Sequence, residues 1–62
     1  QFTDREQEVF TILITTEKTL QEVADELYIS RRVLQRHISS IYKKTDTKTR
    51  VGLIQLYLSN KL

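Results

Sequence analysis

The chain has no proline and only one glycine, Gly52, among its 62 residues. Small all-β domains depend on turns rich in these two residues, whereas both weaken helices. The chain also has no cysteine and a single histidine, which excludes disulfide bonds and leaves no ligand set for a structural zinc ion. We therefore predict one all-α domain over residues 1–62 that is held together by helix packing, without a metal or a cofactor.

Two four-residue patterns predict where the first two helices begin. Residues 3–6 (Thr-Asp-Arg-Glu) and 19–22 (Thr-Leu-Gln-Glu) both have the form of a capping box, in which threonine and glutamate bind each other's backbone amides. After the second box, apolar residues follow the helical spacing i, i+3, i+4, i+7 and i+8. These residues are Leu20, Val23, Ala24, Leu27 and Tyr28. A polar segment at 15–18 is predicted to connect the two helices.

Ser30 is the predicted N-cap of a third helix, which extends over about residues 31–44. At 100° per residue, one side of this helix is apolar and includes His37, which we expect to be a packing residue. A polar connector at 45–49 precedes a fourth helix from about Arg50 to Ser59. The three tyrosines are expected at the edge of the core.

Only a few residues around Ile29 and Ser30 separate the second helix from the third. A connection this short favours the steep crossing of a helix-turn-helix, and the small side chain of Ala24 would let the third helix come close. Tyr28 falls where many such turns have glycine. The predicted fold is a four-helix helix-turn-helix domain of the winged-helix-like superfamily, without a wing. Because the chain begins with Gln1, we expect it to be cut from a longer regulator.

The net charge of +2 conceals a strong asymmetry along the chain. Residues 1–26 carry a net charge of −5, residues 27–50 carry +6, and no acidic residue occurs from Leu27 to Thr45. This polarity predicts a polyanionic partner for the second half of the chain.

The outward side of the third helix predicts what that partner is. An α-helix fits the major groove of B-DNA, where its outward side chains must donate hydrogen bonds to base edges and to flanking phosphates. The residues expected to contact bases are Arg32, Gln35, Arg36 and Ser39. The residues expected to contact phosphates are Ser30, Arg31, Lys43, Lys44, Lys48 and Arg50. Arg50 also suits a structural ion pair, for which Glu6 is one candidate partner.

Several segments, in register from Phe2 to about Tyr57, resemble the LuxR-type (GerE-type) DNA-binding domain of bacterial transcription regulators. Residues 2–10 are similar to its opening pattern Leu-Thr-x-Arg-Glu-x-x-Val-Leu, and residues 22–30 to Glu-Ile-Ala-x-x-Leu-x-x-Ser. His37 follows at the family's spacing, and residues 41–44 with Arg50 resemble its closing signature. The chain departs from the pattern at Val33-Leu34, which replace Thr-Val, and at Gln35, which replaces lysine.

The resemblance implies a cytoplasmic regulator whose third helix enters the major groove of double-stranded DNA, with Gln35 and Arg36 reading bases. It also implies a homodimer formed through the last helix. The residues expected at that dimer contact are Leu53, Leu56, Tyr57 and Leu58. RNA polymerase is a further candidate partner. No contact with a membrane is expected, because no apolar run approaches the roughly 20 residues of a membrane span.

Two other functions compete with this interpretation. A promoter-recognising region of a sigma factor shares the acidic first helix, the Thr-Leu-x-Glu start of the second helix and the basic third helix. A protein-interaction helix-turn-helix would use the same basic surface for an acidic partner. An enzyme is not expected, because no glycine-rich phosphate loop, metal-ligand set or nucleophile set can be assembled.

Overall fold

The structure, a computed structural model, describes residues 2–60 and the side chains of residues 2–59. These residues form four helices and no strand, in the order α1 (Asp4–Thr15), α2 (Leu20–Glu26), α3 (Arg31–Thr45) and α4 (Arg50–Asn60). The predicted all-α fold with four helices is therefore confirmed. In this part of the chain no helix is long and apolar enough to cross a membrane.

The first two helices begin at the predicted capping boxes. The Glu6 amide donates to Thr3 Oγ1 at 3.2 Å, and the Thr3 amide donates to Glu6 Oε1 at 3.0 Å. The same reciprocal pair joins Thr19 and Glu22, at 3.2 Å and 2.8 Å. Ser30 caps α3 in a simpler way, because its Oγ accepts the Val33 amide at 3.2 Å. These bonds satisfy amides that no intrahelical carbonyl can reach.

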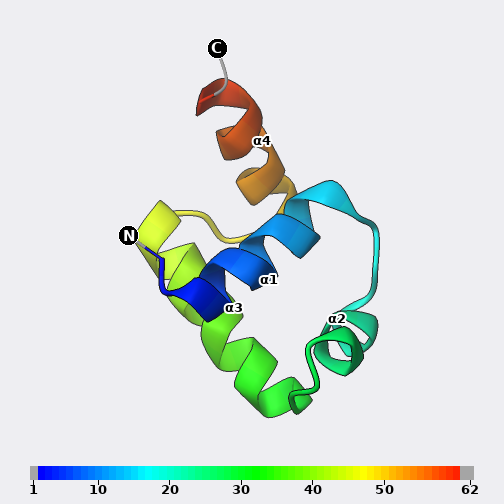
Figure 1. Cartoon of the computed structure of the whole chain (residues 1–62). Helices are drawn as coiled ribbons and strands as arrows, with labels where there is room; N and C mark the ends of the chain where they lie inside the picture. Colours follow the sequence, from blue (N-terminus) through cyan, green and yellow to red (C-terminus); the bar gives the residue numbers. More distant parts are fainter. Residues whose placement is uncertain (1, 61–62) are drawn as a thin grey trace.

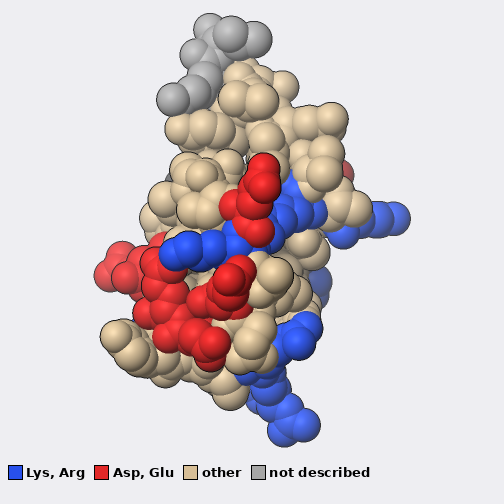
Figure 2. Space-filling view, turned by 90° about the vertical axis from the view of Figure 1, so that its right-hand side faces the viewer, with Lys and Arg blue, Asp and Glu red and all other residues tan. Residues whose placement is uncertain are grey.

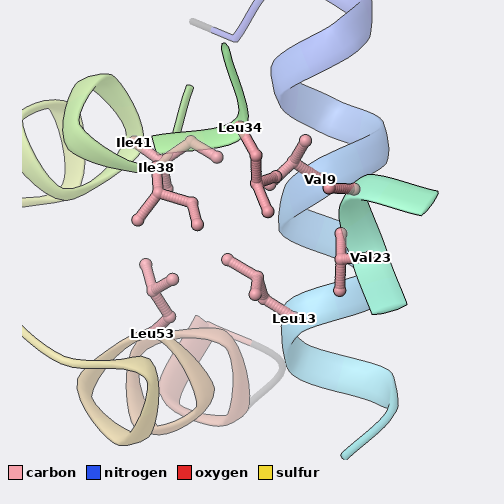
Figure 3. Packing of buried hydrophobic residues seen from close by; sticks show 8 residues of the cluster. Val9, Leu13, Val23, Leu34, Ile38, Ile41 and Leu53 are labelled. Carbon is pink, nitrogen blue, oxygen red and sulfur yellow. The ribbon is translucent and has the colours of Figure 1, made fainter. Parts of the chain in front are cut away.

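The four helices enclose one small core. Helix α1 lies against both α3 and α4, and α2 packs against α3 near the end where α3 begins (Figure 1). All four helices contribute side chains to the centre, and Figure 3 shows these side chains pointing toward one another. The buried apolar residues are Val9, Leu13, Val23, Ala24, Leu34, Ile38, Ile41 and Leu53. This packing fixes α3 by its inner side and leaves its outer side to solvent.

The connection between α2 and α3 corrects one prediction. Tyr28 was expected to continue the apolar side of the second helix, but α2 ends at Glu26 and the Tyr28 side chain is 95% exposed. The backbone turns into the left-handed region at Tyr28, with φ of 58°, so that Ile29 instead packs against the core. Tyr28 does occupy the turn position that glycine often holds. Tyr42 and Tyr57 are half-buried, as predicted.

Candidate nucleic-acid interface

The outer side of α3 presents the four residues that were predicted to contact bases. Arg32, Gln35, Arg36 and Ser39 are all exposed, and they lie opposite the buried residues of the same helix. Their spacing of three or four residues places them in one strip along the helix. Val33, which was predicted on the apolar side, flanks this strip and is 37% exposed. The strip therefore combines hydrogen-bond donors with one exposed apolar side chain.

Basic residues surround this strip at both ends of α3. Arg31 is exposed where the helix begins, and Lys43 and Lys48 are exposed at and after its end. Figure 2 shows basic side chains at the end of the molecule where α3 begins, while acidic side chains gather over α2 and the segment before it. The charge asymmetry of the sequence thus becomes a separation of charge in space. A polyanion approaching α3 from its outer side meets few carboxylates.

Lys44 and Ser40, on the inner edge of α3, bind the carboxylate of Glu6 on α1. The Lys44 Nζ lies 2.7 Å from Glu6 Oε1, and the Ser40 hydroxyl donates to Glu6 Oε2 at 2.6 Å. Glu6 is 6% exposed, and the amide of Thr3 also donates to it. These hydrogen bonds, that from Lys44 foremost, lower the pKa of Glu6 to about 2. Glu6 therefore fastens the end of α3 to the start of α1.

We expect the Glu6→Gln variant to be less stable than the wild type at pH 7, by an amount that shrinks as the pH falls from about 4.5 toward 2. The folded pKa of Glu6 lies below its ordinary value of 4.5. The stability that the carboxylate provides is therefore complete above that ordinary value and is lost as acid protonates it in the folded state. Urea unfolding at a series of pH values should show the wild type taking up about one more proton on unfolding than the variant in this window.

Glu8→Gln is the matched control for that measurement, because Glu8 forms an exposed ion pair with Arg5 one turn away. Such pairs contribute little to stability, so we expect its unfolding free energy to stay close to that of the wild type. A constant difference between Glu6→Gln and the wild type from pH 6 to pH 2 would contradict the role assigned to Glu6.

Arg50 binds backbone carbonyls at the other end of α1. Its Nε donates to the Leu13 carbonyl at 2.8 Å, and its two Nη atoms donate to the carbonyls of Thr16 at 2.7 Å and Lys18 at 2.6 Å. Helix α1 has no basic residue in its last turn, so Arg50 supplies the cationic donor from the start of α4. Of the roles that the sequence left open for Arg50, the structure supports the structural one. The proposed partnership with Glu6 is wrong, because Glu6 lies at the start of α1 and Arg50 binds its end.

The exposed side of α4 differs from the predicted dimer contact. Leu53 is fully buried and points from α4 into the core (Figure 3), so it is not available to a partner and that assignment is corrected. Leu56 and Tyr57 are half-buried, and the Tyr57 ring meets Phe10 edge-on at a centroid distance of 6.5 Å. Leu58 is 56% exposed as expected. Val51, which sequence reasoning missed, is 61% exposed and lies seven residues before Leu58 on the same side of the helix.

The chain matches the family described as "Bacterial regulatory proteins, luxR family" over residues 1–57. It belongs to the LuxR family of regulatory proteins. The match includes most of α4, and this helix packs into the core of the LuxR-family domain through Leu53. Because the matched family is that of the LuxR regulators and the match extends into α4, it argues against the sigma-factor alternative.

Two curated relatives agree with this assignment. The LuxR-family chain is 44% identical over 48 residues to the spore germination protein GerE of Bacillus subtilis (strain 168). The matched residues cover 77% of the chain and 64% of the relative. The chain is 36% identical over 62 residues to the probable transcriptional regulator ycf29 of Cyanophora paradoxa, covering 98% of the chain and 29% of the relative. The chain thus spans less than two thirds of the length of either relative. The comparison with solved structures gave no match.

Proposed function

We propose that this domain binds double-stranded DNA in a sequence-specific way, as the DNA-binding part of a cytoplasmic bacterial transcription regulator. The observation that carries the proposal is the exposed strip of α3, in a helix of 15 residues that has no acidic side chain. Helix α3 would enter the major groove with its first residues toward the base edges. The family membership and the relative named as a probable transcriptional regulator support this function.

The side chains on α3 divide into two roles under this proposal. Arginine pairs well with the N7 and O6 atoms of guanine, and glutamine with the N6 and N7 atoms of adenine. The proposed base contacts are Arg32, Gln35, Arg36 and Ser39, to which exposed Val33 adds an apolar contact for a thymine methyl group. The proposed phosphate contacts are Ser30, Arg31, Lys43 and Lys48, with Lys44 at their inner edge.

We further propose that two copies bind together on DNA through α4. The exposed side chains of Val51 and Leu58 lie one above the other on this helix, with half-buried Ile54 beside them. Half-buried Leu56 and Tyr57 lie on other sides of the helix. Exposed apolar residues grouped on one helix side are typical of an interaction surface. A two-fold pair of domains would recognise half-sites about one helical turn of DNA apart.

The proposed function is tested by titrating the domain against duplexes selected from a random-sequence pool, at several salt concentrations. Affinity should fall as salt is added, and each phosphate neutralised by a basic side chain should make the slope of log affinity against log salt steeper by about 0.9. Affinity should also be higher for selected duplexes than for unrelated ones. A flat salt response, or no binding to any duplex, would contradict DNA binding and favour a protein-interaction module instead.

Arg36→Ala and Lys43→Ala are expected to weaken DNA binding in different ways. Loss of a guanine contact at Arg36 should cost about 1–3 kcal/mol on a selected duplex and little on an unrelated one. Loss of a phosphate contact at Lys43 should weaken binding to both duplexes alike and make the salt slope shallower by about 0.9. Both side chains are exposed, so circular dichroism should show both variants fully folded. Equal weakening on all duplexes by Arg36→Ala would remove Arg36 from the base contacts.

A further inference from the structure

Two features of Tyr28 do not help the domain to fold: its side chain adds almost nothing to the core, and its backbone conformation lowers stability. Its side chain is 95% exposed, so its ring buries almost no surface against the rest of the domain. Its backbone is left-handed, with φ of 58°. When an ordinary L-residue adopts a left-handed conformation, the folding equilibrium constant of the protein falls by a factor of roughly 5 to 30.

The left-handed turn itself is required by the way α2 ends. The Tyr28 amide donates to the Asp25 carbonyl at 3.2 Å, and the Ile29 amide donates to the Ala24 carbonyl at 3.0 Å. This pair of bonds is the Schellman motif, which closes a helix through one left-handed residue and is most often built with glycine. Glycine at residue 28 would form the same two bonds at a lower conformational cost. The tyrosine side chain is therefore not needed to make the turn.

The end of α3 offers a direct comparison. Asp46 is also left-handed, with φ of 55°, and the amides of Asp46 and Thr47 donate to the Lys43 and Tyr42 carbonyls at 3.4 Å and 3.0 Å. Aspartate is one of the few residues that tolerate this conformation, because its short polar side chain can bind the nearby backbone. A bulky aromatic residue has no such compensation. A bulky side chain that is placed at such a cost, and is turned fully outward, indicates a contact outside the chain.

The position of Tyr28 in the fold indicates which partner its side chain would contact. Tyr28 lies two residues before Ser30, the N-cap of α3, and close in sequence to exposed Arg31 and Arg32. The turn is at the end of the molecule where basic side chains gather (Figures 1 and 2). In a helix-turn-helix on DNA, the helix before the turn crosses the sugar-phosphate backbone and the helix after it enters the groove. The turn therefore runs past the backbone that forms the edge of the groove.

We propose that Tyr28 binds the DNA backbone, with its hydroxyl donating to a phosphate oxygen and its ring covering the adjacent sugar. The inference rests on the proposed DNA-binding function and adds a contact from the turn to those of α3. Tyrosine is one of the side chains that bind phosphates in protein–DNA complexes. Because the hydroxyl is neutral, the contact adds affinity without reading sequence and without displacing a counterion.

Two substitutions of Tyr28 test this contact. Tyr28→Phe removes only the hydroxyl and should raise the Kd about fivefold, the value of one hydrogen bond, on selected and unrelated duplexes alike. The salt slope should stay unchanged, whereas Arg31→Ala should reduce it by about 0.9. Tyr28→Gly should raise the Kd further, because the ring is lost as well. The same variant should shift the unfolding equilibrium about fivefold toward the folded state.

Asp46→Gly is the matched control, because it relieves the same backbone conformation at the other end of α3. It should also favour the folded state, yet its affinity for DNA should equal or exceed that of the wild type, since an acidic group is lost. The inference is overturned if the wild type binds DNA and both Tyr28 variants bind every duplex as tightly as it does. Failure of the wild type to bind any duplex would instead overturn the proposed function itself.

Discussion

The Arg50→Ala variant should lose about 3 kcal/mol of unfolding free energy, because one guanidinium serves three backbone carbonyls. The carbonyls of Leu13, Thr16 and Lys18 all accept from it, at the point where α1 ends. Without Arg50 these acceptors lose their charged donor, and the bonds to Leu13 and Thr16 are partly buried. Helix α4 also loses its bonds to the segment that follows α1. A loss of this size is a large part of the total expected for 62 residues, roughly 3–9 kcal/mol.

Urea unfolding of the variant, followed by circular dichroism, measures that loss. Arg50→Lys keeps the positive charge but not the planar group that binds several carbonyls at once, so its loss should be intermediate. Arg5→Ala is the control for deleting an arginine, because Arg5 has an exposed ion pair with Glu8. It should change the unfolding free energy by no more than about 0.5 kcal/mol. If Arg50→Ala were as stable as Arg5→Ala, the bonds to the carbonyls would contribute nothing to the free energy of unfolding.

Local interactions explain why so much of this fold could be predicted from the sequence. Each capping box joins residues three positions apart, so Thr3 with Glu6 and Thr19 with Glu22 are visible in the sequence as patterns. The outer strip of α3 follows from the angular period of a helix together with the buried positions Leu34 and Ile38. Neither inference needs knowledge of how the helices cross.

The features that sequence reasoning missed depend on distant parts of the chain. Glu6 meets Lys44, 38 residues away, and Arg50 meets Leu13, 37 residues away, because of the way α1 lies against α3 and α4. The helical period also placed Tyr28 on the buried side of α2, since a period does not show where a helix ends. Its place in the turn became evident only from the bonds that close α2.

Helix α4 shows the same limit in another form. Leucine, isoleucine, valine and tyrosine occur on almost every side of it, so the sequence does not distinguish a core side from a partner side. The packing of α1 makes that distinction, because it buries Leu53 and leaves Val51 and Leu58 in solvent. The core and the proposed dimer contact therefore lie on different sides of one short helix.

Leu53→Ala and Leu58→Ala should consequently have opposite profiles, although both remove the same atoms from the same helix. Leu53→Ala should lower the unfolding free energy by about 3 kcal/mol, within the range of 2–5 kcal/mol for a leucine truncated in a core. Leu58→Ala should change it by about 0.5 kcal/mol or less, as expected for an exposed position. Urea unfolding of the two variants measures this difference.

The DNA-binding profile should reverse that order. On a duplex with two half-sites, Leu58→Ala should lose the gain in affinity that a pair of domains has over a single half-site, whereas its affinity for one half-site should be unchanged. Leu53→Ala, studied at a temperature where it is still folded, should keep the gain, because Leu53 is fully buried and is not presented to the neighbouring domain. Equal gains for Leu58→Ala and the wild type would mean that this side of α4 does not join two domains on DNA. The exposed apolar pair of Val51 and Leu58 would then have to meet another surface.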